Sequence, residues 1–225
     1  MTPNNIIRQS FDDKAEFNDL AASLIIDLAN KAINKKGSFS IVLCGGGTPK
    51  TIYSKLSNAD TDWSAWHVYF GDERCLPNNH PDRNSLMAHD SWFVKSEIPT
   101  TQVFIIPGEI GNKKAAEQYE NVIAEAEQFD LVLLGLGEDG HIASLFPGHI
   151  WDEDRLVIPV FNAPKAPSER VSLTIKSLSN TRDVIFLVAG KNKAKAFKSW
   201  EDINTTPASL ISATNNLRIL TYGIS

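Results

Sequence analysis

The sequence is poor in cysteine, with only Cys44 and Cys75 among its 225 residues. Two cysteines cannot build a disulfide framework, and neither lies in a Cys-x-x-Cys or Cys/His spacing typical of a metal site. Neither has a nearby base in the sequence, so we interpret both as small apolar side chains rather than nucleophiles. Free thiols of this kind fit a reducing compartment.

Long apolar runs and an excess of positive charge are also missing. No apolar run approaches the roughly 20 residues that a membrane-spanning helix needs. Residues 1–5 lack the basic and apolar regions of a signal peptide. The formal net charge of −5 argues against a nucleic-acid-binding groove. We therefore expect a cytoplasmic monomer or weak homo-oligomer without membrane or nucleic-acid partners, in which any phosphate is held by a local cluster of cations.

The composition is that of an ordinary globular protein, with 42% hydrophobic and 22% charged residues. Apolar strands alternate with amphipathic helices, which predicts a single α/β domain over residues 1–225 with a Rossmann-like, doubly wound, mostly parallel sheet and helices on both faces. The predicted strands are 39–44, 67–70, 103–106, 129–134, 156–160, 170–175, 183–188 and 217–220. The predicted helices are 11–36, 48–56, 83–94, 113–127 and a lysine-rich helix after Gly190. We expect Ser10 and Asp13 to form a capping box, and segment 71–82 to be too rich in proline for regular structure.

The first predicted strand runs into the turn Gly45-Gly46-Gly47-Thr48-Pro49. We expect Thr48 to be the N-cap of the next helix and Pro49 its first residue. Glycines let the backbone approach a ligand, and free amides at a helix N-terminus bind phosphate. The turn is neither a Walker loop nor a dinucleotide motif. It predicts an anion site, the alternative being a turn that only requires a positive φ.

The predicted strand 129–134 leads into a second glycine-rich turn, which carries Asp139 and His141. Parallel strands end at ligand crevices, and a histidine beside a carboxylate is the usual general base near neutral pH. Residues 135–140 also match Gly-x-Gly-x-x-Gly, but Pro147 follows too soon for the long helix of a dinucleotide-binding fold. The spacing leaves open whether Asp139 contacts the imidazole or stabilises the turn.

Four further polar residues border predicted strand ends. Asp72 and Arg74 follow strand 67–70, Arg170 opens a strand, and Lys193 lies in the first turn of the last helix. Cations at such positions can meet a phosphate. The alternative is that they belong to a solvated loop and to the charged surface.

Five segments together resemble the 6-phosphogluconolactonase family, in the family's order. They are Cys-Gly-Gly-Gly-Thr-Pro at 44–49, Gly-Asp-Glu-Arg-Cys-Leu-Pro at 71–77, Gly-Leu-Gly-Glu-Asp-Gly-His-Ile-Ala-Ser-Leu-Phe-Pro-Gly at 135–148, Arg-Val-Ser-Leu-Thr at 170–174 and Gly-Lys-Asn-Lys-Ala at 190–194. The resemblance implies hydrolysis of 6-phosphoglucono-1,5-lactone to 6-phosphogluconate, the second step of the oxidative pentose phosphate pathway, without a metal or an organic cofactor.

The resemblance also implies roles for particular residues. His141 takes the role of general base, which Asp139 orients or tunes, and Asp72 and Arg74 line the substrate pocket. The residues implied to hold the 6-phosphate are Gly46, Gly47, Thr48, Arg170 and Lys193. The family's usual first motif has a serine before its Gly-Gly pair. Because this chain has Cys44 and Gly45 there, Thr48 is the remaining hydroxyl.

Two other functions fit parts of the same sequence pattern. Glucosamine-6-phosphate deaminase/isomerase resembles the chain in fold and turns, but it uses a glutamate five residues beyond the histidine. Phe146 stands there in this chain and cannot transfer protons. A non-catalytic sugar-phosphate-sensing module could bind through Arg170 and Lys193. Such sensors are normally fused to a DNA-binding segment, and none is evident.

Overall fold

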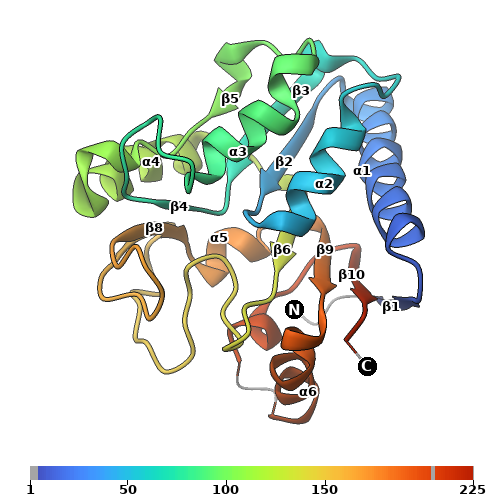
Figure 1. The fold of residues 1–225 in the computed structure, drawn as a ribbon. Helices are drawn as coiled ribbons and strands as arrows, with labels where there is room; N and C mark the ends of the chain where they lie inside the picture. The colour runs from blue at the N-terminus through green and yellow to red at the C-terminus, as the bar shows by residue number, and fades with distance from the viewer. Residues whose placement is uncertain (1–4, 204–205, 225) are drawn as a thin grey trace.

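The computed structural model describes residues 5–203 and 206–224, whose strands form two sheets (Figure 1). The larger sheet has seven strands in the order β1-β10-β9-β6-β2-β3-β5, and all its pairings are parallel. The smaller sheet is antiparallel, in the order β4-β8-β7. The strands are β1 Ile6–Phe11, β2 Phe39–Leu43, β3 Trp66–Phe70, β4 Asp72–Arg74, β5 Val103–Phe104, β6 Phe129–Gly135, β7 Val157–Val160, β8 Arg170–Leu173, β9 Thr181–Ala189 and β10 Asn216–Tyr222.

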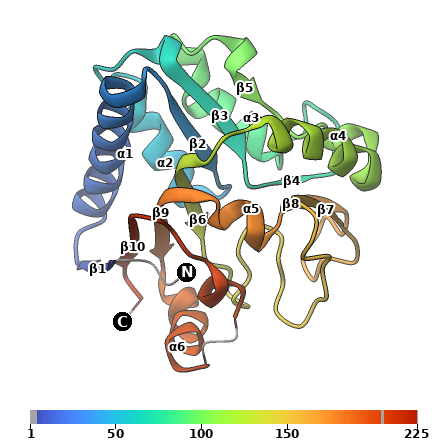
Figure 2. The same cartoon turned by 180° about the vertical axis from the view of Figure 1, so that it is seen from behind.

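Helices lie on both sides of the larger sheet. In Figure 1 α2 and α3 are in front of the strands, and Figure 2 shows α5 in front when the molecule is seen from behind. The helices are α1 Lys14–Lys36, α2 Gly47–Leu56, α3 Asn84–Ser91, α4 Asn112–Glu125, α5 Ile175–Ser179 and α6 Ala194–Ile203. Within the described ranges, no helix combines the length and apolarity needed to cross a bilayer. The predicted α/β class with a mostly parallel sheet is confirmed.

Helix α1 begins one turn later than the sequence suggested. Asp13 is its N-cap and accepts a hydrogen bond of 2.9 Å from the backbone N–H of Glu16. Ser10 takes no part in a capping box: it lies in the unpredicted strand β1, and its hydroxyl hydrogen-bonds that of Thr221. The end near Gly37 is confirmed, because this residue adopts a left-handed conformation with φ 79°.

The middle of the larger sheet explains where a ligand can bind. Strands β2 and β6 are neighbours, with Ile41 opposite Leu131. After β2, the strands β3 and β5 are added toward one edge of the sheet. After β6, the strands β9 and β10 are added toward the other edge. The order of the strands therefore reverses between β2 and β6. In open parallel sheets ligands bind at such a switch point, outside the carboxyl ends of the strands.

Segment 71–82 was wrongly expected to lack regular structure. Its first residues form β4, in which Asp72 lies opposite Ser172 and Arg74 opposite Arg170 of β8. Glu73 is fully buried although it is charged, because it accepts hydrogen bonds from three backbone N–H groups. A polar strand of this kind carries no apolar alternation, which is why the pattern did not reveal it.

Candidate active site

A pocket of about 300 Å³ opens at the switch point of the larger sheet. Its walls come from segments that follow the carboxyl ends of β2, β3, β6 and β9, together with residues of α3 and the segment before β8. Six of the predicted site residues line it: Gly46, Asp72, Arg74, His141, Arg170 and Lys193. A neighbouring pocket of about 380 Å³, which Phe146 and Trp151 help to line, does not include His141.

The histidine turn brings Asp139 and His141 into direct contact. Ring nitrogen Nδ1 of His141 hydrogen-bonds the Oδ1 atom of Asp139, and the same oxygen accepts from the backbone N–H of His141 at 3.4 Å. Asp139 therefore contacts the imidazole and also stabilises the turn. The turn is closed by a 2.7 Å hydrogen bond from the backbone N–H of Gly137 to the carbonyl of His141. Nitrogen Nε2 of His141 has no hydrogen-bond partner among the described residues. Asp139 itself is not among the residues that line the pocket.

Gly137 is required by the closeness of this pair. A β-carbon on Gly137 would lie 2.1 Å from Nδ1 of His141 and 2.5 Å from Oδ1 of Asp139. A side chain at position 137 would therefore overlap the imidazole and the carboxylate. Only glycine leaves room for both groups where they lie. A glycine-rich turn at this point serves the His–Asp pair rather than a dinucleotide, and no helix follows it before Ile150.

The surroundings of His141 favour its neutral form. Burial is the largest effect and lowers the pKa of the imidazole below its ordinary value, although the charge and hydrogen bond of Asp139 act in the opposite direction. Burial alone would raise the pKa of Asp139, but the charge and hydrogen bonds of His141 outweigh it and the pKa is lowered. At neutral pH the pair is therefore a neutral imidazole held by a carboxylate, as a general base requires.

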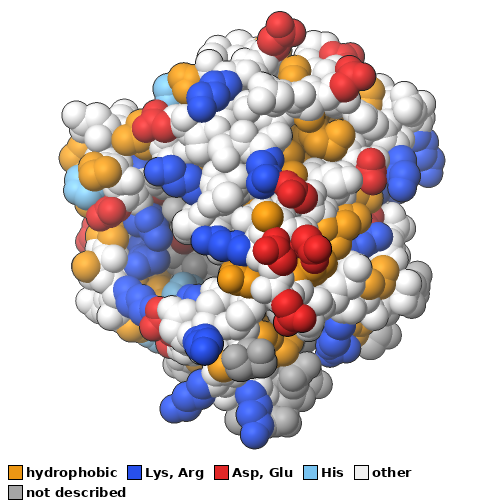
Figure 3. All heavy atoms as spheres, turned by 45° about the vertical axis from the view of Figure 1, so that its right-hand side comes forward, with side chains coloured by type: hydrophobic (Ala, Val, Ile, Leu, Met, Phe, Trp, Pro, Cys, Tyr) orange, Lys and Arg blue, Asp and Glu red, His pale blue; other side chains and the backbone are white. Residues whose placement is uncertain are grey.

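Four cationic side chains line the pocket: Arg74, Lys165, Arg170 and Lys193. Figure 3 shows Lys and Arg side chains gathered around a hollow on the left of that view. Burial is the main reason why the pKa of Arg170 and that of Lys193 are lowered, and nearby cations act in the same direction. An anion in the pocket would reduce the repulsion between these cations. The pocket is therefore locally positive although the whole chain has a net charge of −5.

The guanidinium of Arg170 also shapes the wall of the pocket. Its Nε donates to the carbonyl of Pro167 at 3.1 Å, and its Nη2 donates to the carbonyl of Lys165 at 2.9 Å. Atom Nη1 is left free to face a ligand, because no protein acceptor among the described residues takes its hydrogen bonds. Arg170 thus fixes the segment that carries Lys165.

The glycine turn leads into α2 with a different cap from the predicted one. Gly46, with φ 115°, is the N-cap, and Thr48 is already the second residue of the helix. The prediction of Thr48 as N-cap was wrong because the glycine can adopt this conformation without a side-chain cap. Gly46 lines the pocket, whereas Gly47 and Thr48 do not. Their amides belong to the first turn of α2, where N–H groups lack helical acceptors.

Sequence reasoning missed two polar residues of the pocket, Asn84 and Lys165. Asn84 is the first residue of α3, in a segment predicted only as helix. Lys165 lies between Pro164 and Pro167 in a connection that carried no periodic signal, and its proximity to Arg170 in the sequence was the one available hint.

The remaining reactive side chains do not suit chemistry in this pocket. Cys44 lines it, but burial raises the pKa of its thiol to about 12, and the pKa of Cys75 is raised to about 11. Both thiols are protonated at neutral pH, which agrees with their interpretation as apolar residues. In the ranges 5–203 and 206–224 no three His, Cys, Asp or Glu side chains are grouped so that they could hold a metal ion.

Phe146 occupies the position five residues beyond His141. Its ring is 1% exposed and packs against the imidazole with a centroid separation of 4.7 Å. The guanidinium of Arg170 lies 5.6 Å from the same ring. An aromatic side chain at this point contributes to the burial that lowers the pKa of His141, and it offers no proton-transfer group.

A parallel α/β sheet with a His–Asp pair and a cation-lined pocket at its switch point is typical of α/β proteins whose small-molecule site lies outside the carboxyl ends of the strands. Comparison with known families makes the assignment specific. The family model for glucosamine-6-phosphate isomerases/6-phosphogluconolactonase matches residues 12–220, and the chain belongs to this family.

Individual relatives lie on the lactonase side of the family. The chain is 34% identical to 6-phosphogluconolactonase 3, chloroplastic, of Arabidopsis thaliana over 91% of its own length and 71% of the relative's. It is 40% identical to the 6-phosphogluconolactonase of Synechocystis over 74% of its length and 72% of the relative's. The crystal structure of 6-phosphogluconolactonase from Thermotoga maritima superimposes with a TM-score of 0.90 at 27% identity, covering 97% of this chain and all of that one.

Proposed function

We propose that the protein is a 6-phosphogluconolactonase, which hydrolyses 6-phosphoglucono-1,5-lactone to 6-phosphogluconate in the oxidative branch of the pentose phosphate pathway. The observation that carries the proposal is the position of the His141–Asp139 pair in the same pocket as four cationic side chains. A lactone with a phosphate at its far end needs these two features and no other catalyst. The names of the relatives support the same activity.

In the proposed mechanism the phosphate anchors the substrate. Arg170 and Lys193 contact the 6-phosphate together with the backbone at Gly46, Gly47 and Thr48, while Asp72 and Arg74 line the sugar end of the pocket. Binding energy from the phosphate orients the carbonyl without taking part in the chemistry. The helix N-terminus of α2 adds a favourable field for the anion.

Hydrolysis then needs one base. Asp139 keeps the proton on Nδ1 of His141, so the lone pair of Nε2 accepts a proton from water as the oxygen attacks the lactone carbonyl carbon. The tetrahedral intermediate breaks the bond between that carbon and the ring oxygen, and the imidazolium returns the proton to the departing oxygen. General-base help of this kind contributes roughly 10²–10⁴-fold. Neither a metal nor an organic cofactor is required.

The proposal extends to the setting of the enzyme. It is a single domain over residues 1–225 that works in the cytoplasm as a monomer or weak homo-oligomer, with a phosphorylated sugar lactone as its small-molecule partner and no nucleic-acid or membrane partner. The deaminase alternative is disfavoured because Phe146 lies where that chemistry needs a carboxylate.

The test is acid release from freshly made 6-phosphogluconolactone, with spontaneous hydrolysis subtracted. The native protein should accelerate the reaction, and His141→Ala should lower kcat by about 10²- to 10⁴-fold with little change in KM. His89→Ala, at an exposed position on α3, is the matched control and should keep full activity. Full turnover by the His141 variant would disprove the mechanism, and ammonia release from glucosamine 6-phosphate would favour the deaminase instead.

A further inference from the structure

Among the side chains that line the pocket, hydrogen-bond donors outnumber acceptors that are free to bind a ligand. The four cations can only donate, which suits phosphate and carbonyl oxygens. A sugar lactone also carries hydroxyl groups, which bind best where an acceptor is available. Which protein atom accepts hydrogen bonds from these hydroxyl groups is the subject of the inference below, which rests on the proposed function.

The carboxylates near the pocket are already engaged. Asp72 accepts from the hydroxyl of Ser144 at 2.6 Å and from the side-chain nitrogen of Asn84 at 3.1 Å. Asp139 is taken up by His141. Two side-chain acceptors of the lining are left without a protein partner among the described residues. One is Nε2 of His141, which the proposed mechanism assigns to the attacking water, and the other is the Oδ1 atom of Asn84.

The orientation of the Asn84 amide is fixed by chemistry. Its Nδ2 donates to the backbone carbonyl of Asp72 at 2.9 Å as well as to the Asp72 carboxylate. Both partners only accept, so the amino group must face Asp72 and Oδ1 must face the other way. That oxygen lies 1.9 Å from the point where a β-carbon of Gly45 would stand, so it is directly over the glycine turn. Asn84 and Gly45 both line the pocket.

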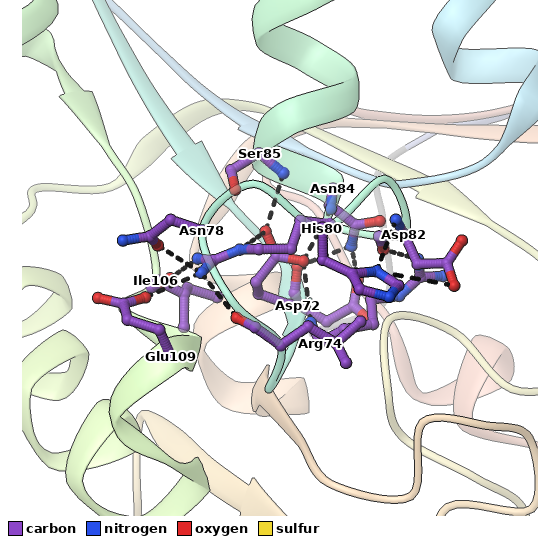
Figure 4. A network of polar contacts seen from close by, with 12 residues as sticks. Asp72, Arg74, Asn78, His80, Asp82, Asn84, Ser85, Ile106 and Glu109 are labelled. Atoms are coloured by element: carbon purple, nitrogen blue, oxygen red, sulfur yellow. Dashed lines mark hydrogen bonds and ion pairs between the residues drawn. The ribbon is translucent and has the colours of Figure 1, made fainter.

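A buried network holds Asn84 in place (Figure 4). The carboxylate of Glu73 accepts from the backbone N–H groups of Asn84 at 2.7 Å and Ser85 at 2.8 Å. The neighbouring Arg83, whose side chain is fully buried, donates to the carbonyl of Ile106 at 2.7 Å and to Glu109 at 2.8 Å. Because the start of α3 is anchored on both sides, the side chain of Asn84, 3% exposed, has little freedom to turn toward another partner.

We infer that Oδ1 of Asn84 accepts a hydrogen bond from one ring hydroxyl of the substrate and thereby determines which sugar lactones the enzyme accepts. A substrate that lacks this hydroxyl leaves a buried acceptor unsatisfied, which costs more than the loss of an exposed hydrogen bond. Asn84 is then a specificity-determining residue. It recognises the sugar, whereas the cations recognise the phosphate.

The experiment compares four lactones: 6-phosphogluconolactone and its 2-deoxy, 3-deoxy and 4-deoxy analogues. For the native enzyme one analogue should lose about 10-fold in kcat/KM more than the other two. Asn84→Ala should lose about the same factor on the parent lactone and nothing further on that one analogue, since both changes remove the same hydrogen bond. An equal loss on all four lactones would show that Asn84 only supports the fold, and this result would overturn the inference.

Asn78→Ala is the matched control. Oδ1 of Asn78 accepts a 2.7 Å hydrogen bond from Arg83, so this residue belongs to the same network, yet it does not line the pocket. It should lower stability while the ranking of the four lactones stays as in the native enzyme. A changed ranking in Asn78→Ala would also contradict a direct role for Asn84.

A binding measurement separates this inference from the proposed function and does not depend on the folding of a variant. Calorimetry with the native protein should show weaker binding of one deoxy form of 6-phosphogluconate than of the parent acid. If one deoxy acid binds more weakly but no lactone is hydrolysed, the proposed function fails, whereas recognition of that hydroxyl in the pocket, the part of the inference that does not depend on turnover, stands. If all four acids bind equally, the inference fails even in an active lactonase.

Discussion

The hydroxyl of Ser144 donates a 2.6 Å hydrogen bond to the carboxylate of Asp72. Ser144 is 2% exposed and Asp72 is 6% exposed, so the bond is sheltered from water. It joins the histidine turn after β6 to strand β4 of the smaller sheet. The two sheets are therefore tied together three residues away from the proposed base.

Removing this bond should weaken both the fold and the site. Ser144→Ala leaves one buried oxygen of Asp72 without its donor, and we expect the free energy of unfolding to fall by about 2 kcal/mol. The turnover number should fall several-fold, because the turn that carries His141 loses an anchor. Urea unfolding and steady-state kinetics measure the two effects. Ser23→Ala, on the exposed face of α1, should change neither, and unaltered stability in Ser144→Ala would contradict the interpretation.

Gly137→Ala should damage the His–Asp pair without any direct contact with substrate. The new methyl group would stand 2.1 Å from Nδ1 of His141, so the ring must move. We expect kcat to fall by about 10²-fold, the lower end of what a general base contributes. Gly135→Ala, where a β-carbon meets nothing within 4 Å, is the control for the imidazole. Titration of His141 by NMR should change only in Gly137→Ala, and an unchanged titration there would rule out the steric argument.

The pH dependence of kcat/KM should show an acid limb below the ordinary pKa of histidine. In the proposed mechanism His141 acts as the neutral base. Because burial lowers its pKa, activity should persist to mildly acid pH and fall as the pH drops through that pKa. A limb well above the ordinary histidine value would contradict this account. The measurement is kcat/KM across pH 5–9, with the spontaneous rate subtracted at each pH.

Asp139→Asn should move this acid limb further down and also slow the enzyme. The charge of Asp139 raises the pKa of His141, so its loss lowers that pKa again. We expect kcat to fall by about 10²-fold because an amide can donate to Nδ1 and stabilise the wrong tautomer. Glu138→Gln in the same turn should leave the limb where it is, since Glu138 does not contact the imidazole. A limb that rises in Asp139→Asn would refute the assignment.

Arg170→Lys should separate phosphate binding from catalysis. An ammonium group cannot hold two loop carbonyls and still reach a ligand, whereas the guanidinium donates to Pro167 and Lys165 and keeps Nη1 free. We expect KM to rise about 10-fold with a smaller change in kcat. Limited trypsin digestion should cut more readily after Lys165 once the segment is released. Arg182→Lys, at the opposite end of the strands, should behave like the native protein, and an unchanged KM in Arg170→Lys would count against the proposed role.

The sequence predicted the larger sheet well because its central strands are buried on both faces. Residues 129–134 are all buried, and a continuous apolar run of that length is typical of a parallel strand between two layers of helices. Two strands escaped detection, the edge strand β1 and the polar strand β4, whereas the edge strand β5 was predicted within 103–106. Strand β1 is mostly exposed and β4 consists of Asp, Glu and Arg, so neither carries the apolar pattern by which strands are recognised.

The candidate site was predictable where a residue type, a turn and a strand end coincided. His141, Asp139 and the glycine turn met this condition, and six of the nine proposed residues line one pocket. Asn84 and Lys165 did not, because their positions depend on contacts made across the fold. The buried carboxylate of Glu73 accepts a hydrogen bond from the backbone N–H of Asn84 and so positions the start of α3 at the pocket. The helical pattern of the sequence does not predict this contact.

The pairing of β2 with β6 has a kinetic consequence. Ile41 and Leu131 are neighbours in the sheet although a long stretch of chain separates them, so the floor of the pocket forms only when that large loop has closed. Partly assembled chains, with local helices and hairpins in place, would keep the glycine turn after β2 and the histidine turn after β6 apart. Recovery of turnover after dilution from denaturant should therefore lag behind the recovery of far-UV circular dichroism. The rate at which enzymatic activity returns then measures the rate at which β2 pairs with β6.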